Sequence, residues 1–156
     1  MKKVVLSIAL FASMSSFAQK TTSKFNYKIG FVTPLPTDLN SSTPQIGLGS
    51  TMGEVTYRVS EKIVAAGNVG YIRFNNQDAN FSQIPVTVGA RYIINEQFYF
   101  GANAGLASYN KGGHTDFIYS PYLGIQLNKI SVDFRYFNTV KPESIRVVGL
   151  VFSYSL

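Results

Sequence analysis

The chain has a single histidine, the residue type that most often carries acid–base catalysis or metal binding near neutral pH. His114 lies in the segment Gly112-Gly113-His114-Thr115-Asp116, which is rich in turn-forming residues. A metal ion would need further ligands, and a His–Asp pair becomes a catalytic triad only with a nucleophile in place. We therefore interpret His114 as a solvated loop residue. We expect no catalytic, metal-binding or cofactor-binding residues.

Charged residues within alternating segments are the second candidate for chemistry. They fall on the same face as glycine, asparagine and serine and opposite to aliphatic and aromatic residues. Enclosed charges are tolerable only when they are paired. The pattern predicts a structural network of mutually satisfied interior charges, with a proton or ion path as the alternative. The residues of this predicted network are Glu54, Arg58, Arg91, Asp133 and Arg135.

The composition indicates a chain with little surface that faces water. Charged residues make up 14% of the 156 residues and apolar residues 46%, whereas a typical soluble domain is roughly 25% charged. A single domain is expected at this length. The net charge of +6 is dispersed without a Lys/Arg run, so we exclude nucleic acid as a partner. The lack of cysteine excludes disulfides and thiolate chemistry.

The first 18 residues have the layout of a secretory signal peptide. Lys2 and Lys3 precede an apolar stretch, and small residues lead to Ala18. A membrane anchor is the alternative, but the uncharged stretch falls short of the ~20 residues that a spanning helix needs. We expect cleavage after Ala18, export of the chain, and one domain over residues 19–156.

Beyond residue 18 the hydrophobic pattern has period two, which predicts strands. In 83–92, for example, Ile84, Val86 and Val88 alternate with Gln83, Thr87 and Gly89. No segment has sustained helical periodicity. The predicted strands cover 25–32, 45–59, 63–74, 83–94, 98–109, 117–127, 130–136 and 145–156.

Two features favour a transmembrane barrel over a soluble sandwich or lipocalin-like barrel. The polar faces carry Gly, Asn, Gln, Ser and Thr where a soluble exterior would carry many Lys and Glu residues. The connections also alternate between long and short, as in outer-membrane barrels with short periplasmic turns and longer external loops. We therefore predict an all-β fold, an eight-stranded antiparallel transmembrane β-barrel with up-and-down meander topology.

An eight-stranded barrel is just wide enough for side chains to fill its interior, so the prediction argues against a pore. The inner face is expected to be polar, with space for long side chains provided by glycines. These glycines are Gly30, Gly70, Gly89, Gly101, Gly105, Gly124 and Gly149. Aromatic residues near the long connections are interpreted as interfacial girdles, with contact to other molecules as the alternative. They are Phe74, Phe81, Tyr109 and Phe117.

Some residues conflict with this simple pattern. Pro85 and Pro121 each remove a backbone donor from a strand, so we expect both at the rim of the barrel. In the second segment Met52 falls on the face of Glu54, and a bulge near 50–53 would return it to the lipid face. Val147 and Val151 fall on the inner face of the last strand, where polar groups are expected.

The last strand resembles the C-terminal insertion signal of outer-membrane barrels. It contains a glycine followed by alternating aromatic residues: Gly149, Phe152 and Tyr154, with Leu156 at the end. Val147 replaces the usual polar residue two positions before the glycine, and Leu156 replaces the terminal aromatic. The resemblance implies the barrel-insertion machinery as a partner.

With this ending and the segment 83–92, nearly all of the chain after residue 19 resembles the small outer-membrane β-barrel domain family of Gram-negative bacteria, of the OmpX-like and OmpA-barrel type. The resemblance implies residence in the cell outer membrane, in contact with its lipid and lipopolysaccharide. Family members include adhesins and envelope-stabilising proteins, so an extracellular or envelope protein is a further expected partner. Fold alone does not carry function.

Three functions follow from this reading as hypotheses. The first is a non-enzymatic structural or surface-interaction protein that acts through its external loops, since loops on rigid scaffolds carry function. The second is an outer-membrane lipid-modifying enzyme that depends on His114. The third is a soluble exported lipocalin-like binding barrel.

Overall fold

The computed structural model describes residues 24–34, 45–47, 49–75, 81–110, 112–140 and 146–156. The predicted signal peptide lies outside these residues. No helix among them is long and apolar enough to cross a membrane. The strands are β1 (Phe25–Pro34), β2 (Gln45–Ile46), β3 (Ser50–Arg58), β4 (Ile63–Asn75), β5 (Phe81–Ile93), β6 (Phe98–Tyr109), β7 (Thr115–Leu127), β8 (Ile130–Val140) and β9 (Arg146–Ser155).

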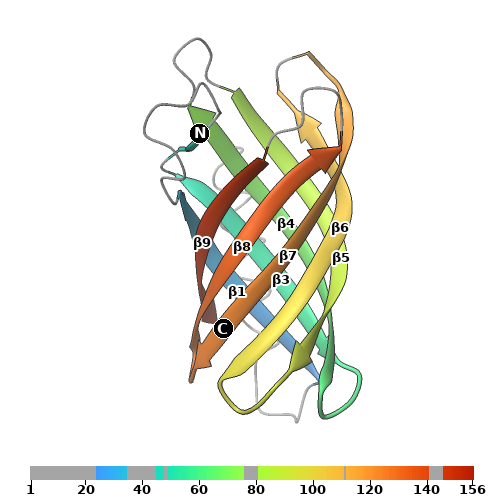
Figure 1. The fold of residues 1–156 in the computed structure, drawn as a ribbon, viewed down its shortest axis with the longest axis vertical. Helices are drawn as coiled ribbons and strands as arrows, with labels where there is room; N and C mark the ends of the chain where they lie inside the picture. The colour runs from blue at the N-terminus through green and yellow to red at the C-terminus, as the bar shows by residue number, and fades with distance from the viewer. Residues whose placement is uncertain (1–23, 35–44, 48, 76–80, 111, 141–145) are drawn as a thin grey trace, which may run out of the picture.

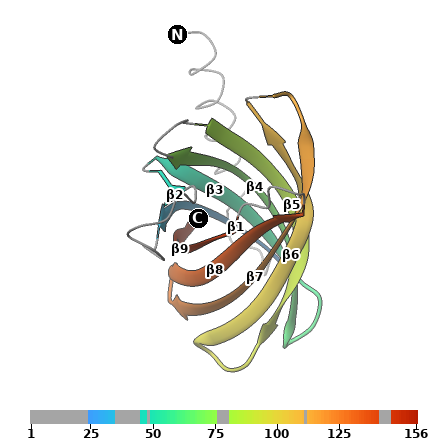
Figure 2. The ribbon, with the colours of Figure 1, turned by 45° about the horizontal axis from the view of Figure 1, so that its top comes forward.

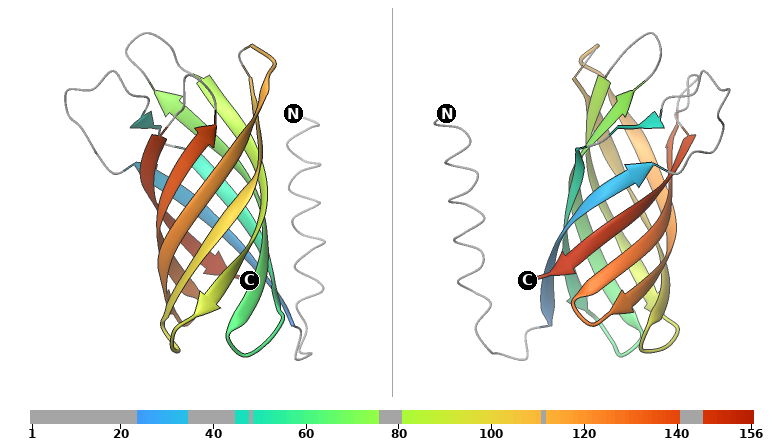
Figure 3. Two further views of the ribbon diagram at one scale, coloured as in Figure 1. Left: turned by 45° about the vertical axis from the view of Figure 1, so that its right-hand side comes forward. Right: turned by 90° about the vertical axis from the view of Figure 1, so that its left-hand side faces the viewer.

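The strands form one closed antiparallel barrel, shown from several directions in Figures 1, 2 and 3. Each long strand pairs with the next one along the chain, and β1 closes the barrel against β9 with Lys28 opposite Ser155 and Phe31 opposite Phe152. The two-residue strand β2 pairs with the end of β4 and is not one of the eight strands that close the barrel. The predicted eight-stranded barrel is confirmed.

Side chains at one end of the barrel define tight turns between β3 and β4, β5 and β6, and β7 and β8. Asn95 Oδ1 accepts hydrogen bonds from the backbone N–H groups of Gln97 and Phe98 at 2.9 and 2.8 Å. Ser60 Oγ accepts one from Ile63 N–H at 3.1 Å. Asn128 adopts a positive φ of 56°, which asparagine tolerates better than most residues. We call this the short-turn end and the opposite one the long-connection end.

The outer face of the barrel is mainly apolar, because aliphatic and aromatic residues occupy most of the alternate positions along the strands. Val88 is 71% exposed, Leu123 60% and Val86 57%. Backbone groups are paired from strand to strand around the closed barrel, which is the condition for placing strands in hydrocarbon. Among the described residues, the large side chains exposed along the strands are mainly apolar, whereas a soluble lipocalin-like barrel would expose many charged ones.

Pro85 and Pro121 lie within the strands and not at the rim, so that expectation was wrong. Pro85 stays in register with Ala107 of β6, and Pro121 with Ala102 of the same strand. On its other side each proline meets a break in the pairing, between β4 and β5 and between β7 and β8. Each missing N–H therefore interrupts one ladder only, and the barrel remains closed.

The second predicted strand is divided, but not by a bulge that reverses its faces. It forms two strands, β2 and β3, and Gly49, just before β3, has a φ of +88°. Ser50 Oγ donates to Gly47 O at 2.9 Å and accepts from Arg73 N–H at 3.0 Å. Met52 remains on the inner face with Glu54 and is 8% exposed. The expected return of Met52 to the lipid face is therefore wrong.

Candidate functional site

The lumen is the first candidate site, because it holds most of the buried charge. Glu54 lies between two arginines: Arg91 Nη2 is 2.6 Å from Oε1, and Arg135 Nη2 is 3.9 Å from Oε2. Arg135 Nη2 also donates to Asp133 Oδ2 at 2.8 Å. The structure thus brings four of the five predicted network residues together in the half of the lumen nearest the short turns. We call these four residues the charge cluster.

Arg58 is the fifth residue, and it lies outside the charge cluster. It is exposed at the end of β3, where its backbone N–H donates to Lys24 O at 2.8 Å. The alternation correctly indicated its face, but it did not show that this position lies at the water-exposed end of the strand.

Two tyrosines enclose the arginines of the charge cluster. The guanidinium of Arg91 lies 4.4 Å from the ring centre of Tyr99, and that of Arg135 lies 4.3 Å from the ring centre of Tyr122. Both distances suit cation–π attraction. The Tyr99 hydroxyl donates to Asp133 Oδ1. Neither tyrosine was among the residues predicted for the network from the sequence.

Glycines opposite these tyrosines make room for the rings. Gly124 pairs with Tyr99 and Gly101 with Tyr122. A Cβ atom at Gly101 would lie 2.6 Å from the Tyr122 ring, and one at Gly124 would overlap the Tyr99 ring and Asp133 Oδ1. Each tyrosine therefore lies flat across the glycine of the neighbouring strand, a known device for covering glycine in sheets.

Lys28 is a further buried cation that the sequence analysis missed. Its side chain is 4% exposed, and Nζ donates to Gln126 Oε1 at 2.7 Å and to Ser131 Oγ at 3.1 Å. The signal was present, because Lys28 alternates with the lipid-facing Tyr27 and Ile29. The rule that located Glu54 could have located Lys28 too.

The other half of the lumen has an apolar core, contrary to the expectation of a polar filling, although polar residues such as Gln83, Asp116 and Thr139 are also buried there. Phe74 and Ile72 are fully buried, and Phe81 stacks on Phe74 with ring centres 5.0 Å apart. Phe74 and Tyr109 thus point inward and are not girdle residues, whereas Phe117 is 48% exposed on the outer face. The apolar plug consists of Val32, Ile46, Met52, Ile72, Phe74, Ala107, Tyr109, Ile118, Phe137, Val147 and Val151.

The two halves of the lumen meet at a cavity of about 10 Å³. Arg135, Asn68 and Ser120 contribute its polar wall, and Phe137 and Ile118 belong to its apolar wall. Its size corresponds to roughly one water molecule.

His114 lies near the long-connection end of the barrel. Its ring stacks on Tyr109 with centres 4.5 Å apart, and Nε2 is 3.5 Å from Asp116 Oδ2. The side chain is 45% exposed. Across the part of the chain that the structure describes, no three His, Cys, Asp or Glu residues lie close enough to hold a metal ion.

Three residues of the C-terminal signal, Gly149, Phe152 and Tyr154, lie on β9, which bridges β8 and β1, and Leu156 follows its end. Phe152 stacks on Phe31 with ring centres 5.2 Å apart. Tyr154 is 47% exposed on the outer face, and Gly149 points inward, where an added Cβ would lie 2.9 Å from Ile46 Cδ1. Leu156 N–H donates to Tyr27 O at 3.0 Å. The end of the chain is thus part of the barrel seam.

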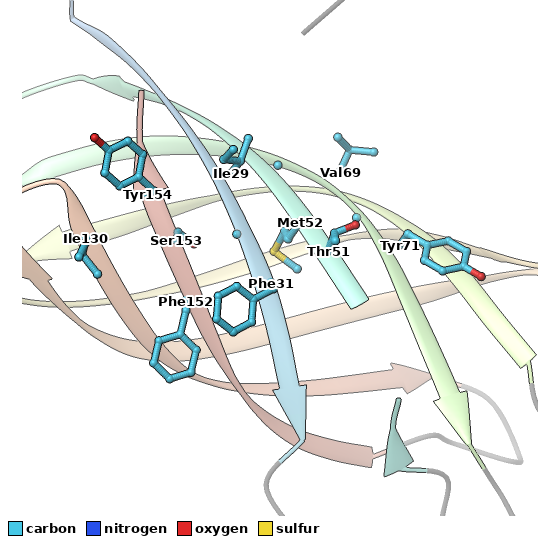
Figure 4. A pocket seen from close by; sticks show the side chains of 13 residues that line it. Ile29, Phe31, Thr51, Met52, Val69, Tyr71, Ile130, Phe152, Ser153 and Tyr154 are labelled. Carbon is cyan, nitrogen blue, oxygen red and sulfur yellow. The ribbon is translucent and has the colours of Figure 1, made fainter. Parts of the chain in front are cut away.

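The outer face beside this seam contains an apolar hollow, shown in Figure 4. It spans side chains from β1, β3, β4, β8 and β9. Small residues of β3 lie between larger ones of β1 and β4, because Gly53 is in register with Ile29 and Val69. This is the second candidate site.

No protein-family model matches the chain, and no curated protein matches it. Solved structures do. The backbone structure of the outer-membrane protein Ail of Yersinia pestis in a phospholipid bilayer nanodisc has a TM-score of 0.60 at 14% identity, over 86% of this chain and 99% of Ail. A crystal structure of Ail, the attachment invasion locus protein of Yersinia pestis, has a TM-score of 0.54 at 16% sequence identity. The match covers 85% of this chain and 95% of Ail.

A de novo designed transmembrane β-barrel has a TM-score of 0.53 at 12% identity, over 88% of this chain and 100% of the design. At these identities the likeness is one of fold. The natural and the designed barrel thus share the overall fold of this chain. The chain therefore has the fold of an eight-stranded transmembrane β-barrel.

Proposed function

We propose that the chain is an integral outer-membrane protein with a closed lumen, and that it acts through its external end and not as a pore. The observation that carries this proposal is the filling of the lumen. The charge cluster occupies one half, and the apolar plug occupies the other half. Water and ions need a continuous polar path, and the apolar plug interrupts it.

Insertion into the membrane is supported by the outward side chains. Val69, Val86 and Leu106 are each more than half exposed although they are apolar, and such a belt would be costly in water. Outer-membrane lipid and lipopolysaccharide are the surroundings that this belt fits. The barrel-insertion machinery is the proposed partner for β9.

The external role is proposed to be contact with other molecules at the long-connection end. Segments that join the strands there are displayed on a rigid barrel, the usual arrangement of binding loops. The name attachment invasion locus protein links one barrel of this fold to attachment. The partner proposed here is an extracellular or envelope protein.

We further propose that the protein is not an enzyme. The four residues of the charge cluster pair with one another, and His114 stacks on Tyr109 beside Asp116. A His114→Ala variant is expected to leave the lipid A composition of cells unchanged. A loss of a lipid A modification in that variant would support the lipid-modifying alternative instead.

The decisive experiment combines three measurements on the full chain. We expect the protein in the outer-membrane fraction, faster gel migration of the unheated than of the heated sample, and no conductance steps in planar bilayers. Recovery in the periplasm without heat-dependent migration would contradict membrane insertion. Stable ion conductance would contradict the closed lumen.

A further inference from the structure

The part of the apolar hollow that lies over β1, β3 and β4 has the shape of a groove one strand wide. Its floor is β3, where Thr51 and Gly53 point outward, and a Cβ added to Gly53 would meet nothing closer than 3.8 Å. Adjacent strands lie about 4.8 Å apart, so the walls on β1 and β4 stand roughly 10 Å from each other. We call it the lipid groove: floor Thr51 and Gly53, walls Ile29, Phe31, Val69 and Tyr71.

The groove is closed at one end and open at the other. Toward the short-turn end the next outward residue of β3 is Val55, which fills the floor opposite Gly67. Toward the long-connection end the chain continues to the exposed Gly49, which has no side chain. From Gly53 to Ser50, where β3 begins, the floor is about 10 Å long, which fits within one leaflet of a hydrocarbon core ~30 Å thick.

A cation stands beside the open end of the groove. Arg73 follows Tyr71 by two residues on the outward face of β4 and is exposed. Its backbone is fixed, because its N–H donates to Ser50 Oγ at 3.0 Å and its carbonyl accepts from Gly47 N–H at 2.6 Å. Among the described residues its guanidinium has no ion pair. Guanidinium groups bind phosphate through paired hydrogen bonds.

We propose that the lipid groove binds one molecule of lipid A, with an acyl chain along Thr51 and Gly53 and a phosphate at Arg73. The proposal rests on the proposed membrane insertion, which places the long-connection end in the outer leaflet. That leaflet supplies a lipid that carries both acyl chains and phosphate. The apolar lining suits the acyl chain, and Arg73 matches the headgroup charge.

The chain offers matched controls for both parts of the site. Arg146 is another exposed cation at the long-connection end, on β9, but the large Val148 and Leu150 follow it on the same face. Ala104 is a small outward residue of β6 away from the groove. Arg146→Gln therefore controls for lost charge, and Ala104→Leu controls for added bulk.

The test uses the full chain, refolded and delipidated in detergent, with native mass spectrometry of bound lipid. Diphosphoryl lipid A is titrated against phosphatidylethanolamine and phosphatidylglycerol. We expect one lipid A bound in preference to either phospholipid, and a loss of about 10-fold in affinity for Arg73→Gln. Gly53→Leu and Thr51→Leu, which block the floor, should reduce binding similarly, while both control variants retain it.

Heat-dependent gel migration of every variant separates this proposal from the one on which it rests. If the wild type inserts but binds lipid A no better than the phospholipids, the groove proposal is overturned. The same holds if Arg146→Gln loses as much affinity as Arg73→Gln, or if Gly53→Leu binds normally. If the wild type fails to insert, the proposed function itself is overturned.

Discussion

Removal of Glu54 should destabilise the barrel strongly, because this carboxylate is shared by two buried arginines. The Glu54 and Arg91 side chains are 8% and 6% exposed, and their atoms are 2.6 Å apart. In Glu54→Leu, Arg91 would lose its closest counter-ion, and Arg135 would keep only Asp133. Breaking a buried pair from one side costs about 3–5 kcal/mol. We expect a loss of that size in the free energy of unfolding.

The double variant sharpens this prediction. Of the buried charges described above, three are cations and two are anions near the short-turn end: Lys28, Arg91 and Arg135 against Glu54 and Asp133. Glu54→Leu raises the excess of buried cations from one to two. Combining it with Arg91→Met returns that excess to one, as in the wild type. We therefore expect the double variant to be more stable than the sum of the single losses predicts, with a coupling of about 1–3 kcal/mol.

Urea titration of protein refolded in lipid vesicles, followed by tyrosine fluorescence and gel migration, measures these differences. Glu96→Leu removes an exposed carboxylate in the turn between β5 and β6 and should change stability by no more than about 0.5 kcal/mol. If Glu54→Leu falls within 1 kcal/mol of wild type, or if the two single losses simply add, the charge cluster does not stabilise the barrel as argued.

Three further predictions concern the packing of the barrel. Gly124→Val should lower the free energy of unfolding by at least about 2 kcal/mol, since the added side chain would displace the Tyr99 ring. Gly67 points outward, so Gly67→Val should be tolerated. Urea unfolding of the two variants tests this difference. Phe74→Ala should cost about 3–5 kcal/mol by leaving a cavity in the apolar plug, and bilayer recordings should still show no conductance. Pro121→Ala restores a backbone N–H donor beside β8, so the amide at residue 121 should be protected from hydrogen exchange. The free energy of unfolding should change by no more than about 1 kcal/mol. Rapid exchange of that amide would contradict the view that only the missing N–H interrupts the pairing with β8.

The strands could be predicted closely from the sequence, because a lipid-facing row must be apolar at every second position. The predicted 98–109 coincides with β6, and 63–74 and 117–127 match β4 and β7 within two residues. The prolines were misplaced for a physical reason. The loss of one N–H affects one neighbouring strand only, so a closed barrel accommodates Pro85 and Pro121 within its strands.

The polarity of the inner face was the part that alternation could not predict. Alternation with period two indicates which side of the barrel wall a residue faces. It does not indicate whether the environment on that side is solvated, filled with paired charges, or apolar. Ile72 and Phe74 lie inward, yet they resemble lipid-facing residues in type. An eight-stranded barrel filled by its own side chains has an interior that packs as a protein core does. Apolar residues on both faces of the strands near the long connections therefore indicate an apolar plug. Val147 and Val151, whose inward positions conflicted with a polar lumen, belong to this plug and were its signal in the sequence.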